Sequence, residues 1–200
     1  NWTHCYDMLH FQGRMHRYLM QFPSRFFYQE KLQTLPDEFG FRQLENYSEK
    51  FNKTKSISSW LCTERIVFID CKNETDSMQA KINLPEAILV AQIVQSLFKM
   101  YQEQQINWTN LTLGVITPFR AQIALIKQQL QLLALDENLI TVDTAERYQG
   151  GSRDIIILST VISDPSQMIQ ISSVNADGVD RKLNVALTRA RDQIILIGNE

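Results

Sequence analysis

The chain has 200 residues, of which 44% are hydrophobic and 21% are charged, enough for one globular domain that buries roughly 70% of its unfolded surface. The formal net charge of −2 excludes the free-standing nucleic-acid binders that rely on a basic excess. No apolar run approaches the ~20 residues of a membrane span, and the first residues lack signal-peptide order. This predicts a cytoplasmic (intracellular) protein with no membrane partner.

The three cysteines are Cys5, Cys62 and Cys71. Their spacing matches no zinc pattern, and their odd number suits a reducing compartment. We therefore expect reduced packing residues and no metal site.

Residues 1–65 have an irregular pattern. FPSRFFYQEKL is rich in aromatic residues, and residues 35–59 are polar with many turn formers. We expect this N-terminal part to wrap an edge of the sheet as a loop-rich segment.

From about residue 66 to residue 200 the hydrophobic period alternates between strand and helix. It predicts strands at 65–70, 111–117, 139–142, 154–162 and 193–198, and helices at 84–101, 118–133 and 183–190. Residues 163–180 have turn chemistry without a sustained period, which predicts an exposed insertion. Strands that alternate with helices form right-handed crossovers, so the predicted class is α/β with a parallel sheet covered on both faces.

Ligands of such a fold bind beyond the carboxyl ends of the strands. At the first candidate turn, Thr117 could cap a helix that begins at Pro118, which would leave backbone N–H groups for a phosphate oxygen. At the second, Asp143 and Glu146 have the spacing of a capping box, and Gly150 and Gly151 allow a sharp turn or close approach of a ligand. Ordinary capping and a functional role are both compatible with either turn.

Two arginines near the C-terminus add cations that we expect near the same rim. On a helix from Leu183 to Ala190, Arg189 and Arg191 would lie on opposite flanks, roughly 160° apart. One could then anchor the helix while the other points across a cleft. The alternative is a solvated helix end whose cations interact with the helix dipole.

The sequence lacks a phosphate cradle of its own. None of the seven glycines precedes a lysine, so no GxxxxGK[ST] loop is present. The Asp-Glu pairs at 37–38 and 136–137 lie in polar stretches, and Asp70, which does end an apolar strand, stands alone.

Five stretches occur in one order: FQGRMH with FPSRFFYQEKL, NLPEA, GVITPFRAQ, VDTAERYQGGSRDIIILS and LNVALTRAR. In order and spacing the chain resembles the second RecA-like domain of superfamily 1 helicases, in the branch that contains the nonsense-mediated-decay RNA helicase and the eukaryotic replication helicase-nuclease. The resemblance implies a RecA-like (P-loop NTPase-type) sheet without a Walker A loop of its own. It covers almost the whole chain and is most specific between residues 83 and 199.

The resemblance also implies roles for individual residues. Arg189 matches the arginine that reaches the γ-phosphate of ATP, and Arg14 matches a second such cation. The implied catalytic residues are Arg14, Arg189, Gln149 and Gly150; the implied nucleotide-binding residues are Arg14, Gly150, Ser152 and Arg189; the implied nucleic-acid-binding residues are Thr117, Pro118, Phe119, Arg120, Asp143 and Thr144.

Three positions depart from the family pattern. Gly13 stands where a tyrosine that can stack on adenine is usual, Ser152 where a glutamate lies near the ribose and phosphates, and Arg17 where a proline follows RMH. These departures concern nucleotide affinity and selectivity more than the fold.

The resulting hypothesis is the C-terminal motor domain of an ATP-dependent helicase or translocase acting on single-stranded DNA or RNA. ATP and Mg²⁺ would be held mainly by an N-terminal RecA-like domain, so this chain alone is expected to be inactive. The rival is a degenerate helicase-like module that binds nucleic acid or protein without catalysis. A third class, a self-contained small doubly wound nucleotide binder, would need a complete ligand site, and the sequence contains none. The resemblance favours 5′ to 3′ translocation but does not separate DNA from RNA.

Overall fold

The computed structural model describes residues 10–35, 40–44, 57–71, 81–148, 151–162, 172–174 and 180–199. The elements in these ranges are β1 (Phe11–Gln12), α1 (Arg17–Phe27), β2 (Gln33–Thr34), α2 (Ile57–Thr63), β3 (Ile66–Asp70), α3 (Leu84–Glu103), β4 (Leu113–Ile116), α4 (Arg120–Leu132), the 3-10 helix η3 (Glu137–Leu139), β5 (Ile140–Asp143), β6 (Arg153–Ser159), α6 (Arg181–Leu187) and β7 (Ala190–Gly198).

The central element is a five-stranded sheet in the order β3-β7-β6-β4-β5, and every neighbouring pair is parallel. All four residues of β4 are buried, as expected for a strand covered on both faces. The predicted α/β, RecA-like class is therefore confirmed. A separate two-stranded sheet pairs β1 with β2.

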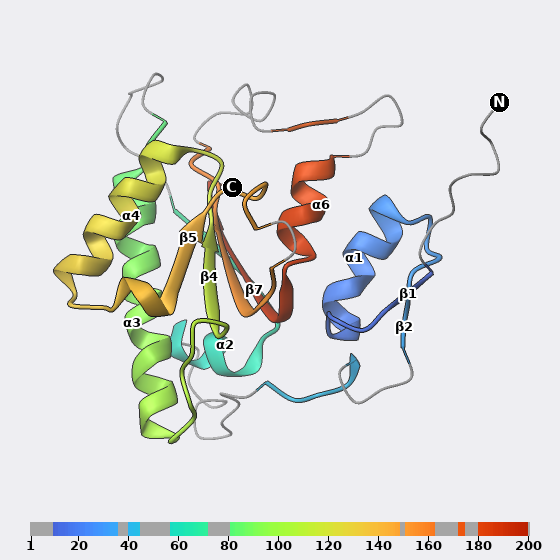
Figure 1. Ribbon diagram of the computed structural model, residues 1–200, viewed down its shortest axis with the longest axis horizontal. Coiled ribbons are helices and arrows are strands. Elements are labelled where there is room, and N and C mark those ends of the chain that lie inside the picture. Colours follow the sequence, from blue (N-terminus) through green and yellow to red (C-terminus); the bar gives the residue numbers. More distant parts are fainter. Residues whose placement is uncertain are drawn as a thin grey trace.

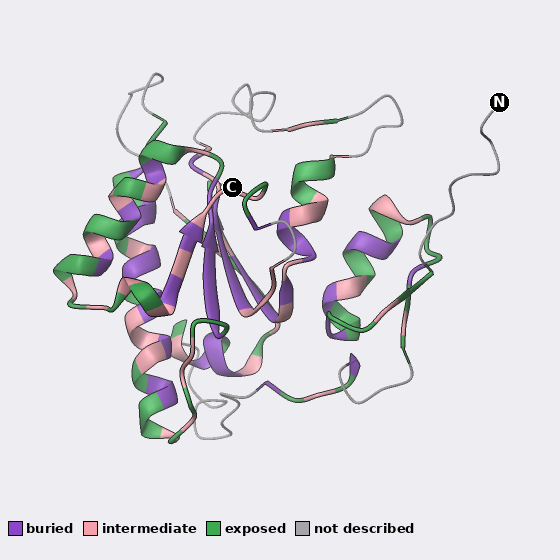
Figure 2. Ribbon diagram, viewed as in Figure 1, coloured by how far each residue is buried: buried purple, intermediate pink, exposed green. Residues whose placement is uncertain are grey.

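Helices form a layer on each face of the sheet (Figure 1). Residues of β6 alternate between the two layers: Ile155 and Ile157 pack with α3 and α4, whereas Ile156 and Leu158 pack with α1 and α6. This is the period of two that a strand imposes on its side chains. The buried residues accordingly concentrate on the strands and the inner sides of the helices (Figure 2).

The helix after β4 begins later than predicted. Thr117 does not cap it; α4 starts at Arg120, and its N-cap residue Phe119 makes no side-chain capping bond. The reason is that Thr117 still belongs to the sheet edge, where its N–H donates to the carbonyl of Asp143 at 3.2 Å. The chain becomes helical only after it has left that pairing.

The helix near the C-terminus ends earlier than predicted. α6 stops at Leu187 and β7 starts at Ala190, which is fully buried and lies opposite Arg153 of β6. Burial in the sheet overrides the helical tendency of this stretch. Arg189 therefore lies in a turn and Arg191 on a strand, so the prediction of two flanks of one helix is wrong.

The described part of the N-terminal segment contains more helix than predicted. α1 begins after His16, whose Nδ1 accepts from the N–H of Tyr18 at 3.2 Å, and it buries Leu19 and Pro23. α1 packs on β7 and α6, so this part of the segment lies against a face of the sheet (Figure 1). The insertion predicted at 163–180 lies mostly outside the described residues.

Cys62 is buried and Cys71 is half-buried, and both are free thiols, which agrees with a packing role; Cys5 lies outside the described residues. Among the residues that the structure describes, no helix combines the length and hydropathy of a membrane span.

Candidate functional site

The candidate residues separate into two groups, which lie at opposite ends of the parallel strands. Ile116 lies opposite Asp143 and Leu158, which places the ends of β4, β5 and β6 at one edge, the carboxyl edge. Arg153 lies opposite Ala190, which places the starts of β6 and β7 at the other, the amino edge. The seven residues of β6 separate the two edges by roughly 20 Å at about 3.3 Å per residue.

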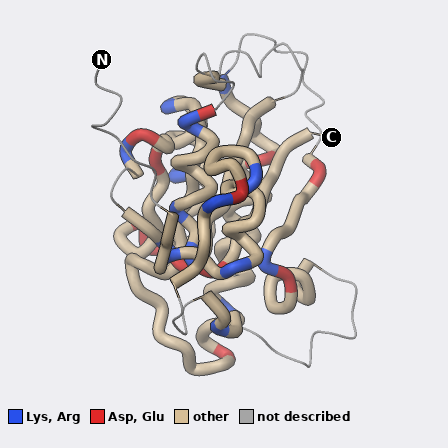
Figure 3. Tube along the Cα trace, turned by 90° about the vertical axis from the view of Figure 1, so that its right-hand side faces the viewer, with Lys and Arg blue, Asp and Glu red and all other residues tan. Residues whose placement is uncertain are grey.

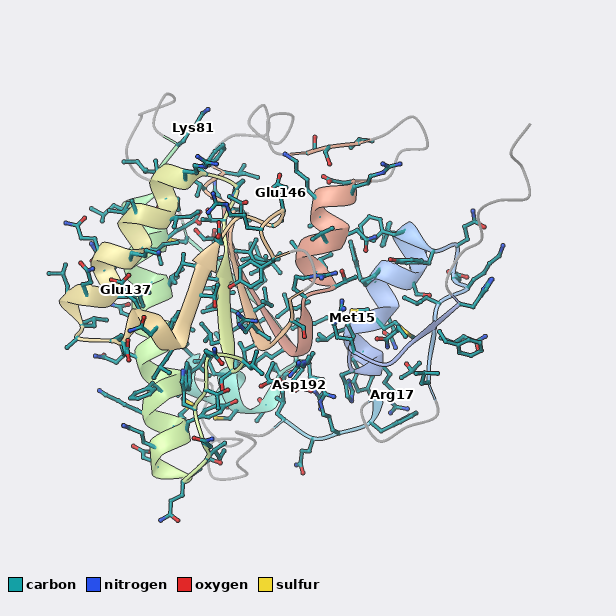
Figure 4. All side chains as sticks on the ribbon, in the orientation of Figure 1. Met15, Arg17, Lys81, Glu137, Glu146 and Asp192 are labelled. Atoms are coloured by element: carbon teal, nitrogen blue, oxygen red, sulfur yellow. The ribbon has the colours of Figure 1, made fainter. Side chains whose placement is uncertain are left out.

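Arg189 and Arg191 lie at the amino edge, so the expectation that they share a rim with Thr117 and Asp143 is wrong. The topology explains the error, because a crossover helix carries the chain back to the amino edge before the next parallel strand begins. The C-terminal end of α6 delivers Arg189 to the start of β7. Figure 4 shows this separation through two labelled residues, with Glu146 near the upper edge and Asp192 near the lower edge.

Three backbone or hydroxyl oxygens hold the Arg189 guanidinium. Its Nε donates to the carbonyl of Val185 at 3.0 Å, Nη1 to the carbonyl of Gly151 at 3.2 Å, and Nη2 to Oγ1 of Thr188 at 3.3 Å. The side chain is half-buried. Because a guanidinium has five N–H donors, it retains donors for a ligand.

Arg14 approaches the same turn from the N-terminal segment. Its Nη1 donates to the carbonyl of Thr188 at 3.1 Å, so both arginines converge on Thr188. Burial and then the neighbouring Arg14 guanidinium lower the pKa of Arg189. Within the described part of the chain, neither arginine forms a salt bridge. The two cations are brought together without a compensating carboxylate, which favours an anionic ligand.

A pocket of about 520 Å³ opens beside these arginines. Its lining residues are Gly13, Arg14, Arg42, Ser152, Asp154, Arg191 and Asp192. Arg191 spans one wall: Nε donates to Oγ of Ser152 at 3.1 Å, and Nη1 pairs with Oδ1 of Asp154 at 3.2 Å. Arg191 therefore orients the Ser152 hydroxyl in the pocket wall.

Two of the lining residues, Asp192 and Arg42, form an ion pair with little exposure to solvent. Asp192 is 6% exposed and pairs with Arg42 and with Arg65. Burial raises the pKa of Asp192, and the hydrogen bond from Arg42 opposes that rise. The sequence pattern had indicated neither Asp192 nor Arg42, because their approach spans 150 residues.

At the carboxyl edge, the N-terminus of α4 carries the exposed residues Pro118 and Arg120 and the half-buried Phe119. Lys81 places its Nζ 5.8 Å from the centre of the Phe119 ring, and the label in Figure 4 shows it at this edge. Helix N-terminal N–H groups, cations and an aromatic ring suit sequence-independent contact with a phosphate backbone and bases. Lys81 was missed because it stands alone in the sequence.

The remaining carboxyl-edge candidates are less open. Thr117 is fully buried, and its hydroxyl has no hydrogen-bond partner among the described residues. Asp143 accepts from the N–H of Thr144 at 2.8 Å, and both are half-buried. The predicted capping box is wrong, because a turn rather than a helix follows β5, and Glu146 pairs instead with Lys182 at 3.0 Å.

Gln149 and Gly150 lie outside the described residues, so their predicted roles stay predictions. Among the residues described, no cluster of three His, Cys, Asp or Glu side chains has the arrangement of a metal site. Basic and acidic positions are interspersed along the trace (Figure 3), in line with the net charge of −2.

A family model described as an AAA domain matches residues 1–200. This chain belongs to that AAA domain family. Helicase sen1 of Schizosaccharomyces pombe is 29% identical over 206 residues, covering 100% of this chain and 11% of that protein. DNA polymerase alpha-associated DNA helicase A of Saccharomyces cerevisiae is 30% identical over 207 residues, covering 96% of this chain and 28% of its own.

The Regulator of nonsense transcripts 1 homolog of Drosophila melanogaster is 32% identical over 200 residues, covering 96% of this chain and 15% of its own. The relatives confirm the resemblance to superfamily 1 helicases, and the chain spans between 11% and 28% of their lengths. Among solved structures, the C-terminal domain of a possible DNA helicase from Lactobacillus plantarum covers 80% of this chain and 87% of its own, with 13% identity and a TM-score of 0.39.

Proposed function

We propose that the chain is the C-terminal motor domain of an ATP-dependent helicase or translocase for single-stranded DNA or RNA. In this proposal it supplies Arg14 and Arg189 to a nucleotide cleft shared with an N-terminal RecA-like domain of the same protein. The carboxyl edge supplies contacts to the nucleic-acid backbone. The observation that carries the proposal is the pair of converging guanidinium groups that have no carboxylate partner in the described chain.

The amino edge fits the phosphates of ATP better than it fits Mg²⁺. ATP supplies the phosphoryl group whose transfer to water drives the motor. Arg189 would stabilise the negative charge that builds on the phosphate oxygens, because a guanidinium is planar and always protonated. Arg14 would add a second positive charge, and Ser152 would present its hydroxyl, held by Arg191, toward the nucleotide. The ligands of Mg²⁺ are assigned to the N-terminal domain.

At the carboxyl edge, the assignment to nucleic acid is supported by the open first turn of α4 and by Lys81 and Arg120 beside it. Such contacts read the backbone and not the sequence. The slightly acidic net charge predicts weak binding by this chain alone, since few cations face the strand. Coupling would arise if closure of the nucleotide cleft shifts the carboxyl edge along the strand.

The experiment compares ATP hydrolysis by the complete protein and by this chain alone, each with and without single-stranded oligonucleotide. We expect stimulated hydrolysis by the complete protein and no appreciable hydrolysis by the chain. The degenerate-module rival predicts oligonucleotide binding without hydrolysis in both. Steady hydrolysis that co-purifies with the chain and disappears in the Arg189→Ala variant would contradict a shared active site.

A further inference from the structure

A fully buried carboxylate lies behind the carboxyl edge. Glu86 is 0% exposed and belongs to the first turn of α3. Asn83 caps that turn: its Oδ1 accepts from the N–H of Glu86 at 3.0 Å, while its Nδ2 donates to Oε1 of Glu86 at 3.1 Å. The helix N-terminus favours the negative charge, yet no cation forms a salt bridge with Glu86 among the described residues.

The Glu86 carboxylate accepts hydrogen bonds from the turn that follows β6. The Ser159 hydroxyl donates to Oε2 of Glu86 at 2.6 Å, and the N–H of Val161 donates to both oxygens at 3.1 Å. A distance of 2.6 Å is typical of an O–H donor bound to an ionised carboxylate. One side chain of α3 thus fixes a hydroxyl and a backbone N–H at the end of the central strand.

Gln122 extends the same network to α4. Its Nε2 donates to the carbonyl of Asn83 at 2.9 Å and to Oγ of Ser159 at 3.3 Å, and its Oε1 accepts from the N–H of Asn83 at 2.8 Å. Gln122, Asn83 and Ser159 are each at most 1% exposed. The first turn of α4 is therefore tied to the first turn of α3 and to the end of β6.

The turn that the network holds is strained. Val161 is β-branched and has φ of 60°, a left-handed conformation that costs a bulky residue energy and persists only when its surroundings enforce it. Thr160, the residue before it, packs so closely on β7 that a Cβ added to Gly198 would lie 2.6 Å from its Oγ1. The turn is thus held from both sides.

Stability alone does not account for this carboxylate. Burial raises the pKa of Glu86 to about 7, so its ionised form carries a cost near neutral pH. Apolar residues of similar volume often replace buried charges without loss of stability. A buried polar network is a better device for fixing one geometry than for adding stability.

We propose that Glu86 is a positioning residue for the nucleic-acid contact at the carboxyl edge: it locks the turn at Ser159–Val161 and, through Gln122, the first turn of α4 into one arrangement. The ligand is the backbone of a single-stranded nucleic acid, and this inference rests on the proposed function. Loss of Glu86 frees Val161 to relax and lets the exposed residues Pro118 and Arg120 shift. Among the described residues, no hydrogen bond of this network reaches the amino edge, so nucleotide binding should stay as it is.

The test uses the complete protein with the variants Glu86→Ala, Glu86→Gln and Ser159→Ala, and Glu103→Gln as the control. Glu103 is the exposed last residue of the same helix. The measurements are the dissociation constants for oligothymidylate, oligouridylate and ATP, and the melting temperature. Glu86→Ala should weaken oligonucleotide binding roughly tenfold, as expected when hydrogen bonds to a charged group are lost, and leave ATP binding unchanged.

Glu86→Gln should restore most of the oligonucleotide affinity, because an amide can accept from the N–H of Val161 and donate to Oγ of Ser159. Ser159→Ala should weaken oligonucleotide binding by a few-fold. If Glu86→Ala does not fold, the oligonucleotide affinity of Ser159→Ala tests the inference in its place. Equal losses of oligonucleotide and ATP affinity would reduce Glu86 to a structural residue and overturn the inference. Unchanged oligonucleotide binding by folded Glu86→Ala or Ser159→Ala would also overturn it. A wild-type protein that binds ATP but no oligonucleotide would instead refute the proposed nucleic-acid function on which the inference rests.

Discussion

Within the described part of the chain, the guanidinium groups of Arg14 and Arg189 at the amino edge are accessible to solvent and have no carboxylate partner. At the carboxyl edge, by contrast, the carboxylate of Glu86 is fully buried and accepts from three donors. An unpaired charge near solvent can bind an ion of opposite charge, since its hydration is replaced at little cost. A buried and fully hydrogen-bonded charge instead fixes the groups around it. The first edge therefore suits chemistry on an anion, and the second suits placement of a long ligand.

The largest expected effect belongs to Arg189 at the amino edge. In the complete protein, Arg189→Ala should lower nucleic-acid-stimulated turnover by about 10³ or more, equivalent to roughly 4 kcal/mol, because its main contact is with charge in the transition state. Arg189→Lys should rescue poorly, since a point charge lacks the planar fork. The control is Arg25→Ala, an exposed arginine in the last turn of α1.

These variants are assayed for turnover, ATP affinity and melting temperature. A modest loss of melting temperature is expected for Arg189→Ala, because the hydrogen bonds to Gly151 and Val185 disappear. If the Arg189→Ala variant retains turnover, the amino edge does not contribute to catalysis through Arg189.

The next effect is on the pH dependence of stability, to which Glu86 at the carboxyl edge and His16 near the amino edge contribute with opposite signs. Burial raises the pKa of Glu86 from 4.5 to about 7. Between these pH values the Glu86 carboxyl is protonated in the folded state but ionised in the unfolded state. The contribution of Glu86 to the free energy of unfolding therefore falls as the pH rises from 4.5 to 7. Burial, and then the charges of Arg65, Arg17 and Arg42, lower the pKa of His16 from 6.5 to about 4. Between these pH values the imidazole is neutral in the folded state but protonated in the unfolded state. The contribution of His16 to the free energy of unfolding therefore increases as the pH rises from 4 to 6.5. Each effect is on the order of 3 kcal/mol.

Because the two windows overlap and the signs are opposite, these groups largely cancel in the wild type. Glu86→Gln should expose the His16 effect as a stability that rises with pH from 4 to 6.5. His16→Asn, which keeps a side-chain acceptor at the N-cap of α1, should expose the Glu86 effect as a stability that falls between 4.5 and 7. Urea unfolding at a series of pH values measures both slopes. Parallel profiles for the two variants would show that neither group titrates as described.

A smaller effect is expected at Arg191, which lines the pocket beside Arg14 and Arg189. Its pair with Asp154 is partly exposed, with side-chain exposures of 35% and 22%, so Arg191→Ala should cost at most about 1 kcal/mol of stability. Turnover should fall by roughly tenfold, because the Ser152 hydroxyl loses its orientation. If Arg191→Ala abolishes turnover while Arg189→Ala retains it, the assignment of the two arginines is reversed.

The smallest effect is expected at the exposed carboxyl edge. Arg120→Ala should weaken binding of single-stranded oligonucleotides evenly across sequences and reduce the slope of log affinity against log salt by about one. Fluorescence titrations of the complete protein at several salt concentrations measure that slope. A change in base preference without a change in slope would mean that this edge reads bases rather than phosphates.

The sequence alone predicted the class of the fold and most of its elements. Alternating strand and helix periods located β3 through α4 within a few residues, because burial on both faces leaves a hydrophobic pattern along the chain. Ile126 and Leu130, for example, lie on the buried side of α4 as their spacing indicates. The order of the five motifs also predicted the family.

The carboxyl-edge network was not predicted from the sequence, although two of its spacings are consistent with it. Asn83 and Glu86 have the three-residue spacing of a capping box, and Gln122 stands four residues before Ile126 on the apolar stripe of α4. Such spacing indicates a buried polar residue but not its partner. Ser159 lies 73 residues after Glu86, so only the tertiary structure brings the two together.

The tertiary structure alone decided at which edge each charged residue lies. The sequence pattern predicts that Arg189 and Arg191 lie at the end of a helix. Instead, α6 ends early because Ala190 pairs with β6, and β7 begins at that residue. Local sequence determines the propensity of a segment, whereas the register with Arg153 of β6 determines where that segment stops. The meeting of Arg14 with Thr188 depends on a contact across 174 residues, which no local pattern encodes.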